Sequence, residues 1–441
     1  MSSEYGQQIS LRDAVQFIVD NRGRTAPTVD FGITLIATNC VNNQDLYPKK
    51  LNVRFVSQDT YDTWFRSHPV CGDILLTNKG SQNGAVCLVP DPVDFCIAQD
   101  MVALRADPKK IEPLYLFAAL RSDLVQKRIK ALNVDAVIPH LKKTDFDKLF
   151  IPLPQRKTQR WVGECYFDLS RRIELLRETN ATLEAIAQAL FKSWFVDFDP
   201  VRAKVAGLDP EGLDVATAAL FPDSFEESEL GFIPRGWRIL PLEDAYEINP
   251  SRKLKKGEVA PYLDMASVGT RGHVVSGVID REMTSGTKFT NGDTLLARIT
   301  PCLENGKSAF VDFLSNDQTG WGSTEFVVLR PRAPLPPYHG YLLARHTPFR
   351  EHAIQSMSGT SGRQRVQNDV LGRYPVVVPA DEIAEAFGDV VGSAQQKIAA
   401  NQEQVKTLTQ LRDTLLPRLI SGQLRLPEVE ASIENMLSEA V

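Results

Sequence analysis

The chain has 441 residues, 43% hydrophobic and 24% charged, which is the composition of a soluble globular protein of two to four domains. No apolar run approaches the roughly 18 residues that a membrane helix needs, and the start of the chain is polar and acidic rather than signal-like. Six cysteines at irregular spacings predict reduced thiols rather than a disulfide framework or a zinc site. These features predict a cytoplasmic protein.

The formal net charge of −5 is unevenly distributed along the chain. Residues 1–160 carry 21 Lys+Arg and 17 Asp+Glu (net +4), and residues 231–380 carry 18 and 14 (net +4). Residues 161–230 carry 6 and 14 (net −8), and residues 381–441 carry 5 and 10 (net −5). Because an electrostatic footprint for DNA is local, two mildly basic segments on an acidic frame are compatible with DNA binding.

The sequence also repeats itself at a nearly constant shift. Pro154 corresponds to Pro379 and Leu183 to Leu408, both at a shift of 225 residues. The shift changes only in variable stretches, to 220 around Asp73 and to 231 near the start of the chain. The repeat predicts one design used twice: a globular unit, a long helix, a second globular unit and a second long helix.

Both globular units are predicted to mix strands and helices. In the first unit, β-rich runs at 33–36, 74–76 and 85–89 precede a helical stretch at 113–132. The second unit repeats this plan with strands at 309–311 and 326–329, followed by a helical stretch at 338–354. Each unit is therefore predicted to be α+β or α/β, and α+β is the preferred fold class.

Two connecting helices have near-heptad apolar stripes, and each is the other's best partner. We expect them to form an antiparallel coiled coil that relates the halves by an internal pseudo-twofold axis. A helix over 171–196 spans roughly 39 Å at 1.5 Å per residue, close to the 34–36 Å of one DNA turn that separates two half-sites; a spacer of arbitrary length is the alternative. Candidate residues for the helix pair or for a subunit interface are Leu183, Leu190, Trp194, Phe195, Leu408, Leu415 and Leu419.

The sequence contains no credible catalytic set. Asn305-Gly306-Lys307-Ser308 resembles the end of a phosphate-binding loop, but Pro301 stands where that motif needs glycine. The histidines are scattered, which disfavours a metal site. Asp197 and Asp199 are interpreted as polar positions where a helix ends before Pro200.

The positive candidates are polar loops at equivalent places in the two units. Glycine lets the backbone approach a ligand, and Arg, Lys, Gln and Asn side chains read base edges, although ordinary hairpin tips are the alternative. A further basic cluster at 252–256 is interpreted either as a binding element or as a solvated loop. The candidate DNA-binding residues are Lys79, Ser81, Gln82, Asn83, His140, Lys142, Lys143, Arg298, Thr300, Lys307, Thr360, Arg363, Gln364 and Arg365.

The helical segments resemble those of a known protein family. Residues 180–198 (NATLEAIAQALFKSWFVDF) closely resemble the central conserved region of type I restriction–modification specificity subunits, and residues 411–422 (LRDTLLPRLISG) resemble their distal conserved region. Residues 231–237 (GFIPRGW) look like the opening of their second target-recognition domain. The resemblance implies the following division: a first target-recognition domain at 1–158, a central helical region at 159–204, a linker at 205–230, a second target-recognition domain at 231–380, a distal helical region at 381–425 and an acidic tail at 426–441.

The resemblance further implies a non-catalytic subunit that reads a bipartite double-stranded DNA target, one half-site per target-recognition domain. Two adenine methyltransferase subunits and motor-nuclease restriction subunits would be its partners. No cofactor is expected on this chain, because S-adenosylmethionine and ATP would bind only the partner subunits. A coiled-coil protein–protein scaffold that ignores DNA is the alternative function, and an enzyme with an unidentified site is a third.

Overall fold

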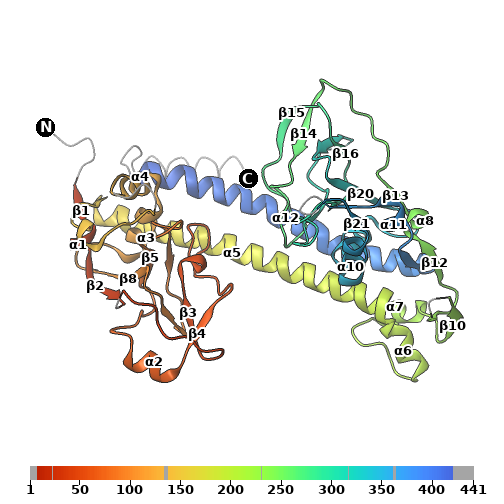
Figure 1. The fold of residues 1–441 in the computed structure, drawn as a ribbon, viewed down its shortest axis with the longest axis horizontal. Helices are drawn as coiled ribbons and strands as arrows, with labels where there is room; N and C mark the ends of the chain where they lie inside the picture. The colour runs from red at the N-terminus through yellow and green to blue at the C-terminus, as the bar shows by residue number, and fades with distance from the viewer. Residues whose placement is uncertain are drawn as a thin grey trace. The chain divides into compact units, whose positions relative to one another are not determined.

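The computed structural model describes residues 7–21, 23–133, 138–229, 231–315, 317–360 and 364–420. Internal contacts divide the chain into unit 1, residues 1–175 with 404–441, and unit 2, residues 176–403. The two long helices, α5 (Arg156–Lys192) and α12 (Asp381–Ile420), each contribute one part to each unit (Figure 1). Among the described residues, no helix is long and apolar enough to cross a membrane.

The remaining elements of unit 1 are short. The strands are β1 (Gln8–Ser10), β2 (Val15–Asp20), β3 (Ile33–Ile36), β4 (Arg54–Val56), β5 (Ile74–Thr77), β6 (Val86–Leu88), β7 (Phe95–Ile97), β8 (Met101–Ala106) and β9 (Phe150–Pro152). The helices are α1 (Leu11–Ala14), α2 (Gln58–Thr63), α3 (Pro113–Arg121) and α4 (Asp123–Ala131), with 3-10 turns at Thr38–Cys40 and Lys143–Asp145.

A four-stranded antiparallel sheet, in the order β2-β8-β5-β6, lies at the centre of unit 1. Successive side chains of a strand point to opposite faces, and β5 follows this rule. Ile74 and Leu76 share one hydrophobic cluster with Phe117 of α3, whereas Leu75 shares another with Ile97 of β7. The sheet is therefore buried on both faces, with helices on one and the three-stranded sheet β4-β3-β7 on the other.

Unit 2 has a similar set of elements. Its strands are β10 (Phe225–Ser228), β11 (Gly231–Pro234), β12 (Arg238–Pro241), β13 (Tyr246–Ile248), β14 (Val259–Leu263), β15 (Ile279–Glu282), β16 (Thr287–Phe289), β17 (Thr294–Ala297), β18 (Ser308–Phe310), β19 (Gly320–Gly322), β20 (Phe326–Pro331), β21 (Met357–Ser358), β22 (Arg365–Val366) and β23 (Pro375–Val378). Its helices are α6 (Asp199–Val205), α7 (Val215–Leu220), α8 (Leu242–Ala245), α9 (Pro337–Arg345), α10 (Thr347–Gln355) and α11 (Asn368–Gly372), with a π-helical turn at Ser193–Asp197.

The strand order of unit 1 recurs in unit 2. The central sheet has the order β13-β20-β17-β18, and Leu296 and Leu295 of β17 again belong to different clusters, one with Tyr338 of α9 and one with Phe289. The second sheet repeats the pairing of unit 1 as well: β14 is parallel to β19 and antiparallel to β15, as β3 is to β7 and β4. The predicted mixed helix-and-sheet fold is confirmed, and the sequence repeat has its counterpart in this shared topology.

The helical stretches predicted at 113–132 and 338–354 are present, and each consists of two consecutive helices. Ser122 has an extended backbone (φ −65°, ψ 145°), and its hydroxyl accepts a hydrogen bond from the amide of Val125 at the start of α4.

 His346 is likewise extended (φ −68°, ψ 129°) and lies two residues before Pro348, which α10 tolerates in its first turn. A capping residue with extended backbone ends one helix and begins the next, and apolar periodicity alone does not reveal it.

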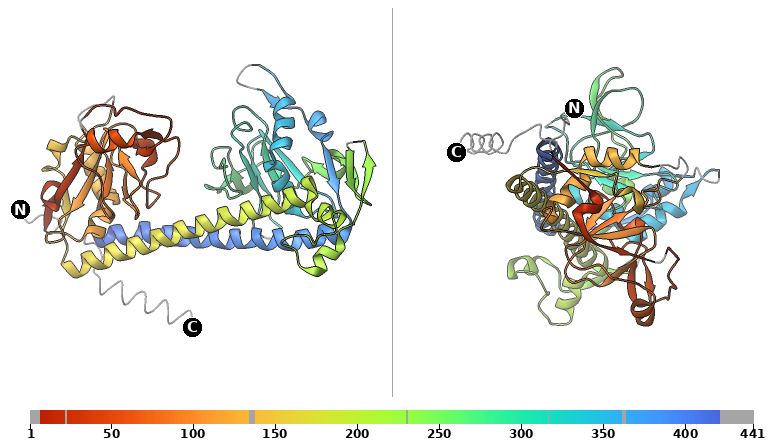
Figure 2. Two further views of the ribbon diagram at one scale, coloured as in Figure 1. Left: turned by 90° about the horizontal axis from the view of Figure 1, so that it is seen from below. Right: turned by 90° about the vertical axis from the view of Figure 1, so that its left-hand side faces the viewer.

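The two long helices agree with the sequence prediction more closely than the short helices do. α5 begins at Arg156, earlier than the predicted 171, and its end agrees with the prediction: Phe198 adopts a left-handed conformation (φ 56°), and α6 then begins with Pro200 in its first turn. Within each unit, the parts of α5 and α12 lie side by side (Figure 2). In unit 2 the side-chain amide of Asn401 donates to Asn180 at 2.8 Å.

Candidate nucleic-acid interface

In unit 1 the structure brings together the two loop segments that the sequence analysis selected. Lys79 forms an isolated antiparallel bridge with His140. The amide of Gly80 donates to the carbonyl of Pro139 at 3.0 Å, and the amide of Leu141 donates to the carbonyl of Asn78 at 2.9 Å. The backbone therefore holds the loop after β5 against the segment that precedes β9.

The side chains of this loop divide into two groups. Lys79, Ser81 and Gln82 are exposed. Asn83 is half-buried: its amide nitrogen donates to Asn133 Oδ1 at 2.8 Å, and its own oxygen accepts the amide of Leu141 at 3.2 Å. Asn83 thus joins the two segments to each other, while the other three side chains remain available to a ligand.

The lysines of the second segment differ in their surroundings. Lys142 and Lys143 are both exposed, and His140 is half-buried. The Lys143 ammonium forms an ion pair with Asp20, at the end of β2. A phosphate would have to compete with that carboxylate for Lys143, but not for Lys142.

Unit 2 joins its corresponding segments in the same manner. Ile299 forms an isolated antiparallel bridge with Arg365. The amide of Thr300 donates to the carbonyl of Gln364 at 3.1 Å, and the amide of Gln364 donates to Thr300 Oγ1 at 3.2 Å. The candidates Thr300 and Gln364 therefore stabilise the junction between the loops. Thr360 is exposed, and Arg363 lies outside the described residues.

Arg365 is exposed but has a carboxylate partner. Its Nε lies 2.9 Å from Glu325 Oε2, and its Nη2 lies 2.5 Å from Oε1, a two-pronged contact. These hydrogen bonds lower the pKa of the Glu325 carboxyl and raise the pKa of Arg365. The contact orients the planar guanidinium and occupies its Nε–Nη2 edge, which leaves the Nη1–Nη2 end for a base or a phosphate.

Two further candidates donate to backbone carbonyls. Arg298 Nη2 donates to Val366 at 3.0 Å, and Lys307 Nζ donates to Met265 at 2.7 Å. Both side chains are half-buried. Their positive charges lie in the loop region, but their described contacts are structural.

The sequence analysis missed two arginines that support the loop after β17. Arg345 Nη1 donates to the carbonyl of Gly306 at 2.7 Å, and Arg350 Nη2 donates to that of Glu304 at 3.0 Å. Burial, followed by the nearby charge of Arg345, lowers the pKa of Arg350. The repeat offered one signal, because Arg121 ends α3 as Arg345 ends α9. Arg121 donates to the carbonyl of Val86 in β6, whereas Arg345 donates to a loop carbonyl.

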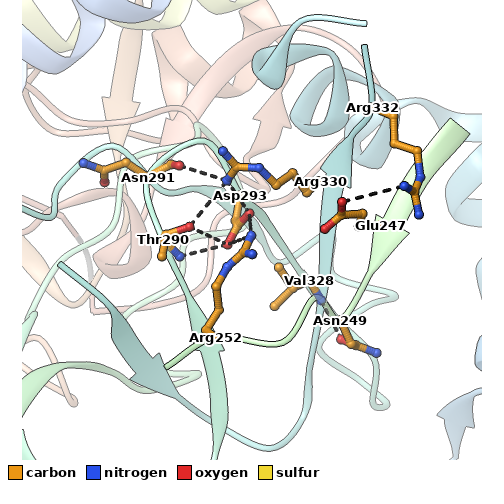
Figure 3. Close-up of polar contacts among 9 residues, drawn as sticks. All are labelled: Glu247, Asn249, Arg252, Thr290, Asn291, Asp293, Val328, Arg330 and Arg332. Atoms are coloured by element: carbon orange, nitrogen blue, oxygen red, sulfur yellow. Dashed lines mark hydrogen bonds and ion pairs between the residues drawn. The ribbon is translucent and has the colours of Figure 1, made fainter. Parts of the chain in front are cut away.

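The basic cluster at 252–256 is divided between two roles. Arg252 Nη2 lies 2.8 Å from Asp293 Oδ1, and Arg330 Nη1 lies 2.8 Å from the same oxygen (Figure 3). Asp293 is fully buried, so Arg252 neutralises an internal charge. The lysines of the cluster, Lys253, Lys255 and Lys256, are exposed.

The candidate helix-pair and interface residues also occupy different environments. Trp194 and Phe195 are buried in unit 2, where their rings lie 5.5 and 4.7 Å from the ring of Phe387 in α12. Leu419 is buried in the core of unit 1, and Leu183, Leu190 and Leu408 are half-buried. The side chain of Leu415 lies outside the described part of the chain.

Comparison with known proteins finds similarity to one family over much of the chain. Residues 62–185 match the type I restriction modification DNA specificity domain. The HindI specificity subunit of Haemophilus influenzae is 24% identical over 403 residues, which cover 80% of this chain and 86% of that protein. The MjaIX specificity subunit of Methanocaldococcus jannaschii is 24% identical over 372 residues, covering 81% and 79%.

A solved structure agrees in fold. The crystal structure of the type I restriction–modification system S subunit from M. genitalium matches with a TM-score of 0.52 and 16% identity, over 95% of this chain and 97% of that one. The resemblance that the helical motifs predict is thereby confirmed: this chain is similar to the specificity subunits of type I restriction–modification systems.

Proposed function

We propose that this chain is the DNA-specificity subunit of a type I restriction–modification complex and that each unit reads one half-site of a bipartite target. The observation that carries the proposal is the matched pair of loop junctions. Lys79 pairs with His140 in unit 1 and Ile299 with Arg365 in unit 2, on sheets of the same strand order. The similarity to specificity subunits over about 80% of the chain supports it.

The charge distribution supports the same function. Exposed Lys79, Lys142 and Arg365 belong to the two segments of net charge +4. Basic side chains contact phosphates, whereas the polar groups of the loops suit base edges. We therefore expect duplex binding that weakens steeply with salt, because phosphate contacts release counterions.

The helix pair is proposed to act as a ruler that sets the separation of the half-sites. Two contacts support antiparallel pairing: Asn180 with Asn401 in unit 2, and Ser170 with Arg412 in unit 1. From the first contact to the second, the position on α5 moves back by ten residues, from 180 to 170. The position on α12 moves forward by eleven, from 401 to 412. This direction is the basis for the proposed coiled coil and internal pseudo-twofold axis.

The chain is proposed to have no activity of its own. Two adenine methyltransferase subunits and the motor-nuclease subunits would supply the chemistry, with S-adenosylmethionine and ATP bound on those partners. The exposed parts of α5 and α12 would dock them. The proposed location is the cytoplasm, where the complex would meet the genome.

A base-modification map of the native genome, with and without the gene for this chain, tests the proposal. We expect methylated adenines at one split motif, two short blocks with a constant gap, to disappear when the gene is removed. An unchanged map, together with purified complex that binds duplex DNA without salt dependence, would contradict it and favour a protein–protein scaffold.

A further inference from the structure

A cavity of about 340 Å³ opens in unit 1 beside β3 and β7. Leu35 and Ile97 line it from these strands, Asn21 from the end of β2, and Trp64 from the end of α2. Its size falls within the range of about 300–1,000 Å³ that is typical of small-molecule sites. It is large enough for a ligand and far larger than the roughly 30 Å³ that one water occupies.

Asn21 is the most informative residue of this cavity. Its side chain is only 4% exposed, and its amide nitrogen donates to the carbonyl of Ile97. That carbonyl can only accept, so the orientation of the amide is determined and Oδ1 is the atom that remains. Among the described residues Asn21 Oδ1 has no hydrogen-bond partner. A buried acceptor without a partner is costly, and a ligand with an N–H group would satisfy it.

The other polar groups of the cavity suit the rest of a nucleotide. Arg24 and Arg54 line the cavity and are exposed residues, and guanidinium groups pair well with phosphate. Trp64 is half-buried and offers an aromatic surface of the kind on which bases stack. Asp100 adds a second acceptor to the lining.

The cavity also adjoins the candidate DNA-binding loop of unit 1. The carbonyl of Asp100 accepts the amide of Asn78 at 3.1 Å, and Asn78 immediately precedes Lys79. We propose that this cavity binds one nucleotide whose base carries an exocyclic amine: the amine donates to Asn21 Oδ1, the base stacks on Trp64, and the phosphate lies at Arg24 and Arg54. If the nucleotide is part of DNA, this inference rests on the proposed function. A free mononucleotide would present the same groups to the cavity.

The test uses the full chain and two probes that differ in one group, 2′-deoxyadenosine 5′-monophosphate and the 5′-monophosphate of purine 2′-deoxyriboside, in which a hydrogen replaces the exocyclic amine. Calorimetry should show binding of the adenine nucleotide and about tenfold weaker binding of the unsubstituted purine nucleotide, which has no amine to donate to Asn21 Oδ1. Arg54→Ala and Trp64→Leu should each weaken binding of the adenine nucleotide about tenfold. Arg12→Ala removes an exposed charge on α1 that does not line the cavity, and it should leave the affinity for the adenine nucleotide unchanged.

A competition experiment identifies the source of the nucleotide. If a duplex with the mapped motif displaces the adenine nucleotide, the cavity takes a nucleotide of DNA; if both bind together, it takes a free one. Two results together would overturn the proposal: the chain binds neither nucleotide, and Arg54→Ala binds the duplex with the same affinity as Arg12→Ala. Duplex binding by the unmodified chain would then still support the proposed function. Thermal unfolding of each variant confirms that it is folded.

Discussion

The carboxylate of Asp293 and the guanidinium of Arg330 lie 2.8 Å apart in unit 2, and Asp73 and Arg105 form the corresponding pair in unit 1 at 2.9 Å. Each aspartate is buried, and each also accepts the backbone amide three residues earlier, at 2.8 Å in unit 2 and 2.9 Å in unit 1. The pair thus ties the turn before one central strand to the neighbouring strand. Arg252 adds a second cation to Asp293, and Asp73 has no corresponding second cation among the residues that the structure describes.

Asp293→Asn should destabilise unit 2. The substitution leaves two guanidinium groups beside a buried neutral amide, and loss of one partner of a buried ion pair costs on the order of 3 kcal/mol. Denaturant unfolding of the full chain, with hydrogen exchange followed at β17 and β20, measures the loss. Asp280→Asn is the control, because Asp280 is exposed in the same unit; equal effects of the two substitutions would contradict the assigned role.

His339 should make unit 2 sensitive to acid. Burial lowers the pKa of His339 to about 3, and Nδ1 of its ring contacts the hydroxyl of Tyr246. The unfolded chain therefore binds a proton between about pH 6.5 and 3 that the folded unit does not, so stability falls as the pH falls through this window. The slope approaches about 1.4 kcal/mol per pH unit.

The variant His339→Gln keeps a polar partner for Tyr246 but does not titrate in that window. We expect a flatter dependence of the unfolding free energy on pH for this variant. His140→Asn in unit 1 serves as the matched control and should retain the slope. An unchanged slope in His339→Gln would show that another group is responsible.

Asn180 and Asn401 should be energetically coupled. Asn401 is 1% exposed and donates to Asn180, whose own amide donates to the carbonyl of Ile398 at 3.4 Å. Asn401→Ala should cost about 1 kcal/mol, and the double alanine variant should cost less than the two single variants added together. Strict additivity in a double-mutant cycle of unfolding free energies would argue against the hydrogen bond.

The sequence predicted the features that depend on local pattern. Residues 33–36 form β3 as expected, and the long apolar stripes correspond to α5 and α12. The repeat also located the loops that form equivalent junctions, since Lys79 meets His140 across a separation of 61 residues and Ile299 meets Arg365 across 66.

The sequence could not reveal which polar side chains are used inside the protein. Arg365 is engaged by Glu325, and Lys307 by the carbonyl of Met265, each about 40 residues away along the chain. Such pairs depend on the tertiary fold rather than on spacing. The unsatisfied oxygen of Asn21 is equally invisible before the strands around it are assembled.

Arg365→Ala should impair recognition through the second half-site only. The guanidinium is exposed, oriented by Glu325, and joined by its backbone to the loop after β17. A specific contact between a base and an arginine contributes about 1–3 kcal/mol, so affinity for the mapped duplex should fall at least about fivefold. Duplexes altered in one half-site at a time locate the effect. The same substitution in the companion residue Arg363, outside the described residues, is expected to act on this half-site too.

Glu325→Gln is the informative companion to Arg365→Ala. It removes the carboxylate that orients Arg365 but leaves the cation in place. We expect weaker discrimination between bases of the second half-site, with non-specific duplex binding maintained or increased because a negative charge is lost. A defect in the first half-site in either variant would contradict the assignment of one half-site to each unit.

Shortening both helices at the same level should shorten the gap between the half-sites. Joint deletion of residues 177–183 from α5 and 398–404 from α12 is centred on the contact between Asn180 and Asn401. Seven residues at 1.5 Å each remove roughly 10.5 Å, or about three base pairs at 3.4 Å per step. The modification map should show the same two blocks with a gap about three base pairs shorter.

Deletion of residues 177–183 from α5 alone is the control for that experiment. It displaces the apolar stripe of one helix relative to the other, so it should destabilise the pair rather than define a new gap. An unchanged gap in the joint deletion, with methylation retained, would refute the ruler. A changed block sequence would mean instead that the helices influence how each unit reads its bases.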